Sequence, residues 1–443
     1  MFLSAAATGK RKWAAPRPTT SSASPEPEPA DLRYSGLKRL GLLLSAGAAS
    51  KILQFTLTCP FPPLSGGEIR CAANARALSA VGEVLTVSLT GSPAQTWLSN
   101  VRHLALESAR RNGAWQSHRP HPTMRIMPAD ELAEADALWR AFAPDLVVVE
   151  NIVLAQLLDL APQHGARTVI DLHDIDSKTV ADGIAGLPVL KRLRKVRENR
   201  RRIKQARDAD RHAAAVADQV WVCSGVDRTL LSALGPTGDV RVIANPIPEE
   251  SVLSLPTTSR RYEALRLCFV GHLGYFPNID AVKQMGRRMA PHLAASGRDW
   301  SITVAGKTPD NLVRRICAEH GLRLVENPDS LHDLLASAGY APMPLRYGGG
   351  TRIKALEAMA AGLVVCATEK AVEGLGLQAG RHFLAARDAG ELGAKILSLA
   401  AQPEAAAEMA AAGRAFVSEK HSSAAIGREI LQAVADLMAR RPD

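Results

Sequence analysis

The sequence predicts an α/β protein in which two doubly wound domains face each other across a cleft. The first observation is length: 443 residues exceed the roughly 250–300 residues that a single hydrophobic core serves. The second is that short apolar runs alternate with helical segments, which is typical of parallel sheets covered on both faces. The third is a break in this pattern from Asn245 to Glu263, where prolines and polar residues indicate a linker.

The first series of the alternating pattern predicts strands of buried, branched apolar residues with helices between them. The expected strands are 51–57, 84–89, 146–149, 168–172 and 219–223, and the expected helices include 69–81 and 154–163.

The second series repeats this organisation after the break. Its expected strands are 265–270, 301–305, 322–325, 340–342 and 364–367. Its expected helices are 280–295, 311–320, 330–336, 352–361 and 389–400, followed by an amphipathic helix over 425–440. The predicted divisions are a low-complexity extension (1–48), a first domain (49–246), a linker (247–263), a second domain (264–420) and a C-terminal helix (421–443).

Composition limits the partners and the compartment. The 54 basic and 44 acidic residues leave a net charge of +10, which favours anionic partners. The six cysteines show no metal-ligand or disulfide spacing, so we expect no metal site and a reducing cytoplasm. No apolar run is long enough to span a bilayer. Residues 1–35 are rich in Ala, Ser, Pro and Thr, which predicts disorder and, on a weaker signal, a transit peptide.

The most informative stretch runs from Tyr347 to Gly362 and reads YGGGTRIKALEAMAAG. Its glycines let the backbone approach a ligand, and Thr351 is a good N-cap for the helix that follows. Arg352 and Lys354 place two positive charges where the helix dipole disfavours them unless an anion is bound. The stretch therefore predicts a phosphate site; the alternative is a capped surface helix.

Two further segments follow predicted strands of the first domain, where doubly wound sheets bind ligands. In one, Gly66 and Gly67 open a helix; a plain turn is the alternative. In the other, the strand ends in DLHDID, and its alternating side chains do not obviously converge on a metal. His173 is the candidate functional group there, and a structural histidine is the alternative.

These segments resemble the signatures of retaining glycosyltransferases of family 4, and matching segments recur in order over residues 50–430. The 347–362 stretch is similar to the family pattern G-G-[TS]-R-[IL]-K-x-L-E-A-M-A-x-G, and the 62–67 loop to P-P-x-x-G-G. The resemblance implies the GT-B fold of two Rossmann-like domains. It also implies that the last helix returns to the first domain, and that a sugar moves from a nucleotide diphosphate to a hydroxyl with retention.

The resemblance also implies roles for individual residues. Arg352 and Lys354 would stabilise the diphosphate, and His173 would contact the donor sugar. The remaining donor-binding candidates are Gly66, Gly67, Gly271, His272, Gly306, Lys307, Glu326, Gly349, Gly350, Thr351 and Glu357. For Lys307, an exposed surface lysine is an equal alternative.

The acceptor-binding candidates are Arg70, Asp174 and Asp176, all near the two loops of the first domain. Arg70 lies one turn into its helix and faces either the acceptor or solvent. Asp174 or Asp176 either orients His173 or binds acceptor hydroxyls.

The chain departs from the family pattern in two places. His272 and Asn278 stand roughly where many members carry an arginine and a lysine, so we expect Arg352 and Lys354 to supply the charge instead. Glu357 matches the second glutamate of the family E-x7-E motif, which bonds the ribose, whereas Gly349 replaces the first.

A basic run from Lys191 to Arg211 holds eleven basic and three acidic residues. It predicts a solvated helix. Docking on an anionic membrane surface is the main alternative, and nucleic-acid binding is disfavoured because no aromatics are interleaved.

The predicted function is a cytoplasmic, metal-independent retaining glycosyltransferase, peripheral on the inner membrane face if the basic run docks there. Its donor would be a nucleotide-diphosphate sugar, with no other cofactor, and its acceptor a glycan or lipid-linked glycan of the polysaccharide or cell-envelope kind. The alternatives are an epimerase or phosphorylase on the same fold, and a non-catalytic sugar- or membrane-binding relative.

Overall fold

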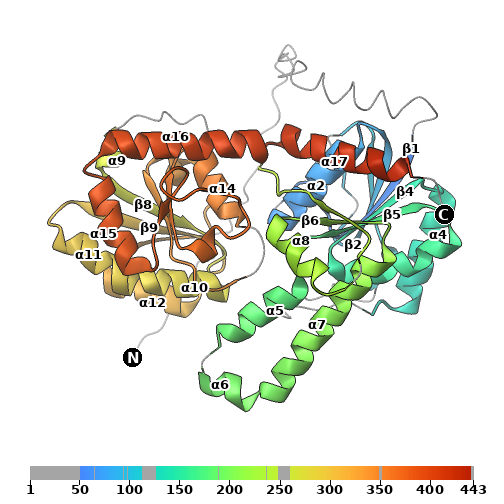
Figure 1. Ribbon diagram of the computed structural model, residues 1–443, viewed down its shortest axis with the longest axis horizontal. Coiled ribbons are helices and arrows are strands. Elements are labelled where there is room, and N and C mark those ends of the chain that lie inside the picture. The colour runs from blue at the N-terminus through green and yellow to red at the C-terminus, as the bar shows by residue number, and fades with distance from the viewer. Residues whose placement is uncertain are drawn as a thin grey trace, which may run out of the picture.

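The computed structural model describes residues 50–63, 65–92, 94–96, 98–111, 126–187, 189–235, 237–247, 260–348 and 352–440. It contains two α/β domains side by side (Figure 1). The predicted fold class is confirmed. The low-complexity extension, and with it any transit peptide, lies outside the described residues, as does most of the predicted linker.

The N-terminal domain is built on a seven-stranded parallel sheet of order β3-β2-β1-β4-β5-β6-β7. Its strands are β1 (Ser50–Thr58), β2 (Gly82–Thr90), β3 (Val101–Ala105), β4 (Leu146–Glu150), β5 (Arg167–Leu172), β6 (Gln219–Val222) and β7 (Asp239–Val242). Its helices are α2 (Gly66–Leu78), α3 (Glu107–Arg111), α4 (Ala129–Phe142), the 3₁₀ helix η1 (Ile152–Gln163), α5 (Asp176–Ala185), α6 (Val189–Arg194), α7 (Val196–Val216) and α8 (Gly225–Ser232).

Continuous apolar strands produce a core on each face of this sheet. In β4, Val147 and Val149 join the core beneath α4, η1 and α7. Leu146 and Val148 join the opposite core, beneath α2 and α17. This alternation buries every residue of the strand, as expected for a doubly wound sheet.

The C-terminal domain has a six-stranded parallel sheet of order β10-β9-β8-β11-β12-β13. Its strands are β8 (Leu265–Val270), β9 (Trp300–Gly306), β10 (Arg323–Glu326), β11 (Tyr340–Met343), β12 (Val364–Ala367) and β13 (Leu384–Ala385). Its helices are α9 (Arg260–Glu263), α10 (Phe276–Gln284), α11 (Ala290–Ala295), α12 (Asn311–His320), α13 (His332–Ala336), α14 (Ile353–Ala360), α15 (Ala389–Leu399) and α16 (Pro403–Lys420), with the 3₁₀ turn η4 (Glu369–Ala371).

Some elements differ from the sequence expectations. The segment 154–163 lies in a 3₁₀ helix rather than an α-helix, with Pro162 inside it. The expected helix 280–295 is interrupted by a π-helical segment, Met285–Met289. Pro291 follows this segment and cannot donate to the carbonyl one turn before it, which accounts for the interruption. Residues 260–263, expected to end the linker, form α9, and Tyr262 is fully buried in the C-terminal domain.

The last helix, α17 (Ser423–Met438), crosses back to the N-terminal domain (Figure 1). Its apolar face joins the core beneath α2 through Ile426, Ile430 and Leu431. The chain thus passes between the domains twice, and the two passages touch: Ile247 N–H donates to His421 O at 2.8 Å. None of the helices in the described residues has the length and apolarity that crossing a membrane requires.

We expect the return helix to contribute strongly to N-terminal domain stability. Ile430→Ala removes a fully buried side chain and should lower the free energy of unfolding by about 2–5 kcal/mol. Met438→Ala, on the same helix but 38% exposed, is the control and should change it by less than about 0.5 kcal/mol. Urea unfolding followed by fluorescence measures both, since Trp221 lies in the same core. Equal effects would contradict the packing described.

Candidate active site

The start of α14 gathers the two predicted phosphate-binding cations at the carboxyl edge of the C-terminal sheet. Gly349, Gly350 and Thr351 lie outside the described residues. The N-cap position of α14 falls on Arg352 and not on Thr351, which corrects the expectation, and the Arg352 side chain makes no capping hydrogen bond. Arg352 is only 8% exposed, and its Nη2 donates to Gly348 O at 2.6 Å. A Cβ on Gly348 would lie 3.0 Å from that same Nη2, and its φ is +117°, so glycine is required there.

Lys354 is held by the first turn of α10, the helix that follows β8. Its Nζ donates to Asn278 Oδ1 and lies 5.1 Å from the centre of the Phe269 ring. Asn278 Nδ2 in turn donates to His272 O at 2.9 Å. Asn278, in the first turn of α10, thus positions the Lys354 cation of α14. A Cβ on Gly271 would lie 2.8 Å from Asn278 Nδ2 and 3.3 Å from Lys354 Nζ, so a side chain there would displace this contact.

The electrostatic state of Lys354 is unusual. Burial, together with the charge of Arg352, lowers its pKa to about 7, although Glu357 opposes this. Burial raises the pKa of Glu357. Two cations held close together in a poorly solvated place favour an anion between them.

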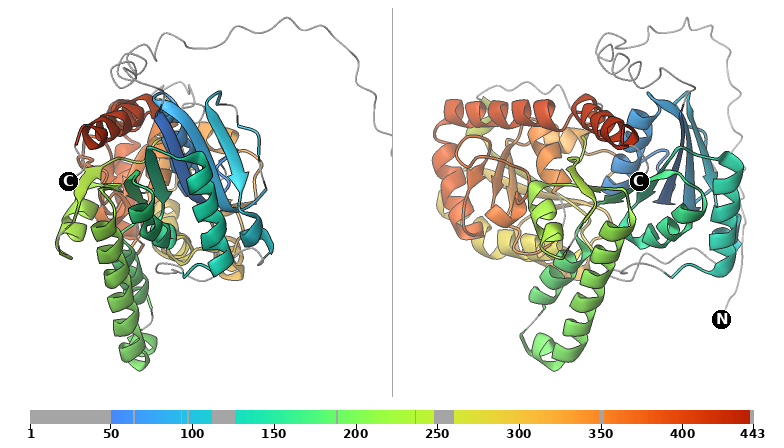
Figure 2. Two further views of the ribbon diagram at one scale, coloured as in Figure 1. Left: turned by 90° about the vertical axis from the view of Figure 1, so that its right-hand side faces the viewer. Right: turned by 45° about the vertical axis from the view of Figure 1, so that its right-hand side comes forward.

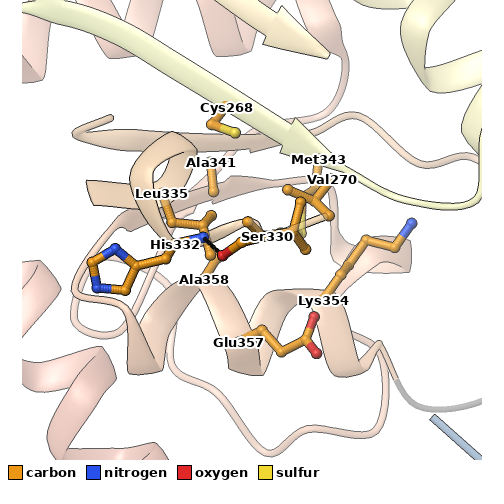
Figure 3. A pocket seen from close by; sticks show the side chains of 11 residues that line it. Cys268, Val270, Ser330, His332, Leu335, Ala341, Met343, Lys354, Glu357 and Ala358 are labelled. Atoms are coloured by element: carbon orange, nitrogen blue, oxygen red, sulfur yellow. Dashed lines mark hydrogen bonds between the residues drawn. The ribbon is translucent and has the colours of Figure 1, made fainter. Parts of the chain in front are cut away.

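A cavity of about 350 Å³ opens beside these residues (Figure 3). Lys354 and Glu357 of α14 form one wall, and the ends of β8 and β11 form the floor. The opposite wall comes from the start of α13, where Ser330 Oγ accepts from His332 N at 3.1 Å. The sequence reasoning did not include Ser330 and His332, whose only signal is their place after β10.

Other donor candidates of the C-terminal domain lie apart from this cavity or have structural roles. Gly306 is required by packing, because a Cβ there would lie 1.7 Å from Gly271 O. Lys307 is exposed. The Glu326 side chain is also exposed and is held by a two-pronged ion pair with Arg314, at 2.8 Å for each hydrogen bond. The Glu326 side chain is therefore occupied, and only the backbone near it is available to bind the donor as predicted.

On the facing domain, the Gly66-Gly67 turn meets both α14 and His173. A Cβ on Gly66 would lie 2.5 Å from Ile353 Cδ1, so the two domains touch here. A Cβ on Gly67 would lie 3.5 Å from His173 Nδ1. The structure thus brings the two N-terminal segments singled out in the sequence next to the helix that carries Arg352 and Lys354.

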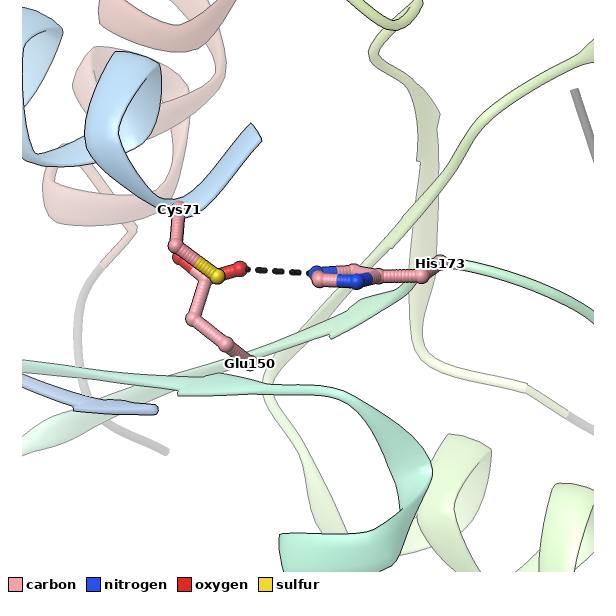
Figure 4. A group of neighbouring side chains, drawn as sticks. All are labelled: Cys71, Glu150 and His173. Carbon is pink, nitrogen blue, oxygen red and sulfur yellow. Dashed lines mark hydrogen bonds and ion pairs between the residues drawn. The ribbon is translucent and has the colours of Figure 1, made fainter. Parts of the chain in front are cut away.

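His173 is oriented by a carboxylate that the sequence reasoning missed. Its Nε2 lies 3.1 Å from Glu150 Oε2 (Figure 4). This leaves Nδ1 on the side of Gly67, where a Cβ would lie 3.5 Å from it. Burial alone would lower the pKa of His173, but the hydrogen bond to Glu150 and the charge of Asp171 raise it. Glu150 ends the apolar strand β4, and a charged residue closing a buried run was the available signal.

Arg70 does not reach an acceptor, which corrects the sequence expectation. It is 1% exposed, and Nε and Nη2 donate to the two oxygens of Asp171 at 2.7 Å each. Its Nη1 donates to Ile243 O and to Asn245 Oδ1. Burial alone would raise the pKa of Asp171, but Arg70 holds it below its usual range. Arg70 is a buried structural cation.

Cys71, Glu150 and His173 bring three metal-ligand atoms within 4.8 Å of one another (Figure 4). The donor set fits a metal poorly. Burial and the charge of Glu150 raise the pKa of the Cys71 thiol well above its ordinary value, which disfavours the thiolate that binds metals. Glu150 already accepts from Gln54, Asn74 and His173. We interpret the group as a hydrogen-bonded positioning network.

The two acidic acceptor candidates separate in the structure. Asp174 is half-buried next to His173, and its charge interacts with Arg352 of the other domain. Burial raises its pKa to about 6, while His173 and Arg352 act in the opposite direction. Asp176 is buried at the start of α5, against Asp210 of α7, and burial together with Asp210 raises its pKa to about 7. Asp174 remains an acceptor candidate; Asp176 is not placed to bind one, which corrects that expectation.

Two ion pairs join the domains, and neither was predicted. Lys178 Nζ lies 2.9 Å from Glu373 Oε2, and Lys370 Nζ lies 2.7 Å from Asp182 Oδ2. Lys178 and Asp182 belong to α5, whereas their partners follow β12. Each domain contributes one acid and one base to this latch.

Comparison with known proteins agrees with this geometry. Residues 264–402 match the family model described as glycosyl transferases group 1. No curated protein matches the chain. Among solved structures, sucrose-phosphate synthase from Thermosynechococcus elongatus superposes with a TM-score of 0.65 at 17% identity, covering 88% of this chain and 99% of that one.

Two further structures are similar over nearly their whole length. A glycosyltransferase from Rickettsia africae has a TM-score of 0.62 at 13% identity, covering 88% of this chain and 99% of that one. HepE of Anabaena in complex with UDP-glucose has a TM-score of 0.58 at 14% identity, covering 87% of this chain and 100% of that one. Such identities show the fold, and with the family match they support a glycosyltransferase of the GT-B fold.

The lowered pKa of Lys354 predicts a pH-dependent stability. Between the folded pKa of about 7 and the ordinary value of 10.5, the unfolded chain binds more protons than the folded one. Folded wild type should therefore gain stability relative to Lys354→Met as the pH rises through this window, by up to about 1.4 kcal/mol per pH unit. Urea unfolding of both proteins measures the difference. A difference that stays constant across the window would contradict the assignment.

Proposed function

We propose that the protein is a retaining glycosyltransferase of family 4 that moves a hexose from a nucleotide-diphosphate sugar to a hydroxyl acceptor. The observation that carries this proposal is the pairing of Arg352 and Lys354 at the start of α14, beside a cavity and opposite His173. Two positive charges this close favour a bound anion, and the cavity is lined partly by apolar side chains, as a nucleoside site requires.

The leaving group of such a reaction is a nucleoside diphosphate, so negative charge builds on it as the bond to the sugar C1 breaks. Arg352 and protonated Lys354 stabilise that charge, aided by the N-terminus of α14. Because both side chains are already held by hydrogen bonds to Gly348 and Asn278, little reorganisation accompanies the reaction. A diphosphate between them raises the pKa of Lys354 and keeps it charged. No protein nucleophile or metal is assigned in this proposal.

His173 contacts the donor sugar in this proposal, and Glu150 orients it. The fixed Nε2 contact with Glu150 directs Nδ1 toward the Gly66-Gly67 turn, where a donor would pass between the domains. Glu357, with its raised pKa at the cavity wall, hydrogen-bonds the ribose. Asp174 is the acceptor-side group, because it adjoins His173 and interacts electrostatically with Arg352.

The acceptor in this proposal is a glycan of the polysaccharide or cell-envelope kind, free or lipid-linked, used on the cytoplasmic side of a membrane. The basic run from Lys191 to Arg211 and the net charge of +10 support an anionic surface nearby.

A thermal-shift screen against UDP, GDP, ADP, CMP and dTDP tests the donor site. A ligand at about 100 times its dissociation constant stabilises by about 2.7 kcal/mol, which such a screen detects. We expect one diphosphate to shift the wild type and not Arg352→Ala/Lys354→Ala. Arg381→Ala removes an exposed arginine elsewhere in the same domain and should behave as wild type.

Catalysis is tested by turnover of the matching nucleotide sugar. Arg352→Ala should lower turnover by roughly two orders of magnitude or more, because it removes transition-state charge stabilisation. Near-normal turnover would sink the assignment. Conversion of the donor to an epimer without an acceptor would instead indicate an epimerase, and the absence of both a shift and donor turnover would indicate a non-catalytic relative.

A further inference from the structure

An arm formed by α5, α6 and α7 projects from the N-terminal domain (Figure 1, Figure 2). Its far end is α6, none of whose residues is buried, followed directly by the first turns of α7. The arm is an ordered element: Asn199 Nδ2 donates to Arg192 O at 3.3 Å, which ties α6 to α7. We define the arm tip as Val189 to Arg201.

Large apolar side chains stand in solvent at the arm tip. Val189 is 60% exposed, Leu190 71%, Leu193 62% and Val196 37%. Four such side chains within eight residues form a patch that water solvates poorly. Nothing in the described part of the chain buries them, since the tip lies away from both domain cores (Figure 2).

Basic side chains are interleaved with this apolar patch. Lys191, Arg192, Arg194 and Arg197 are all exposed, and within the described part of the chain none of them forms an ion pair. The one acid of the tip, Glu198, is already paired with Lys195 at 3.0 Å. The tip therefore offers unneutralised positive charge around an exposed apolar centre.

This combination matches an anionic bilayer surface better than other partners. Lipid head groups attract the basic ring, and the hydrocarbon boundary accepts the leucines and valines. A nucleic acid would use the charge but leave the apolar patch in water, and the tip carries no aromatic side chain for stacking. We propose that the arm tip docks on anionic membrane lipids by inserting Leu190 and Leu193 between head groups bound by its basic residues.

The arm also links the membrane to the cleft. Helix α5 begins at Asp176, two residues after Asp174, and forms both latch ion pairs through Lys178 and Asp182. Docking of the tip holds the cleft at a fixed height above the bilayer. On the proposed function, this is the arrangement that a lipid-linked acceptor needs; the docking itself does not depend on that function.

Vesicle flotation of the full chain tests the docking. Wild type should bind phosphatidylcholine vesicles that contain phosphatidylglycerol, and binding should fall with salt. Leu190→Glu/Leu193→Glu should bind them roughly tenfold more weakly or worse, because apolar insertion is lost and negative charge is added. The matched control is Val226→Glu/Leu230→Glu, which alters two exposed apolar residues of α8, 39% and 36% exposed, and should bind as wild type.

The charge requirement is tested separately. Arg192→Ala/Arg194→Ala should weaken binding to the same vesicles by roughly tenfold or more. Arg287→Ala/Arg323→Ala, which removes two exposed arginines of the C-terminal domain, should not. Equal binding of wild type to vesicles with and without phosphatidylglycerol would overturn the electrostatic part of the proposal.

Three results would overturn the docking as a whole. In the first, the wild type floats with neither kind of vesicle. In the second, light scattering shows a wild-type dimer that Leu190→Glu/Leu193→Glu dissociates. In the third, the full chain binds RNA or DNA through the arm tip more tightly than it binds vesicles. Thermal-shift response to the donor diphosphate is measured on the same variants and should be unchanged. Vesicle binding without any nucleotide response would reject the glycosyltransferase proposal and leave the docking intact.

Discussion

The buried ion pair between Arg70 and Asp171 is the interaction on which the arrangement of the cleft depends. It joins α2 to the end of β5, and both of its side chains are almost inaccessible to water. A buried charge without its partner is strongly destabilising, so neither residue can change alone. From this pair the network extends in two directions. Asn74 bridges Asp171 to Glu150, which orients His173, while Arg70 Nη1 reaches the backbone that leaves β7 for the second domain.

The fold was largely predictable because its strands are continuous apolar runs. Ten of them were expected within a few residues of their observed bounds, since a strand buried on both faces has no ambiguous position. The three missed strands lacked that signal: β3 alternates buried and exposed residues, β7 is only half-buried, and β13 has two residues. Helix α16 was missed because alanine fills so many of its positions that no apolar face stands out. The π-helical interruption near Pro291 depends on hydrogen bonding that periodicity does not report.

The candidate site was predictable where glycine and charge mark it, and not where it is built from contacts distant in sequence. Glycines next to Arg352 and Lys354 indicated an anion site directly. Arg70 was misassigned because its partner, Asp171, lies 101 residues away in sequence, and an arginine near a Gly-Gly turn suggests a ligand until that partner is known. Similarly, His272 and Asn278 stand where an arginine and a lysine were expected from the family pattern, so the sequence suggested that two positive charges were missing. In the structure, the Asn278 side chain instead accepts a hydrogen bond from Lys354 and holds it in place.

The contacts between the domains suit a cleft that opens and closes. The latch pairs Lys178–Glu373 and Lys370–Asp182 are partly exposed, with side-chain exposures of 17% and 35% in the first and 24% and 25% in the second. Ion pairs that water can reach contribute little, so opening the latch costs little. The two segments that connect the domains are joined by hydrogen bonds instead of ion pairs. Ile247 N–H donates to His421 O, and His421 Nδ1 is hydrogen-bonded to Asn245 O at 2.9 Å. We therefore expect any motion between the domains to centre on the buried contact between Asn245 and His421. The side chain of Asn245 also accepts from Arg70, so this contact between the connecting segments belongs to the same hydrogen-bonded network as the Arg70–Asp171 pair.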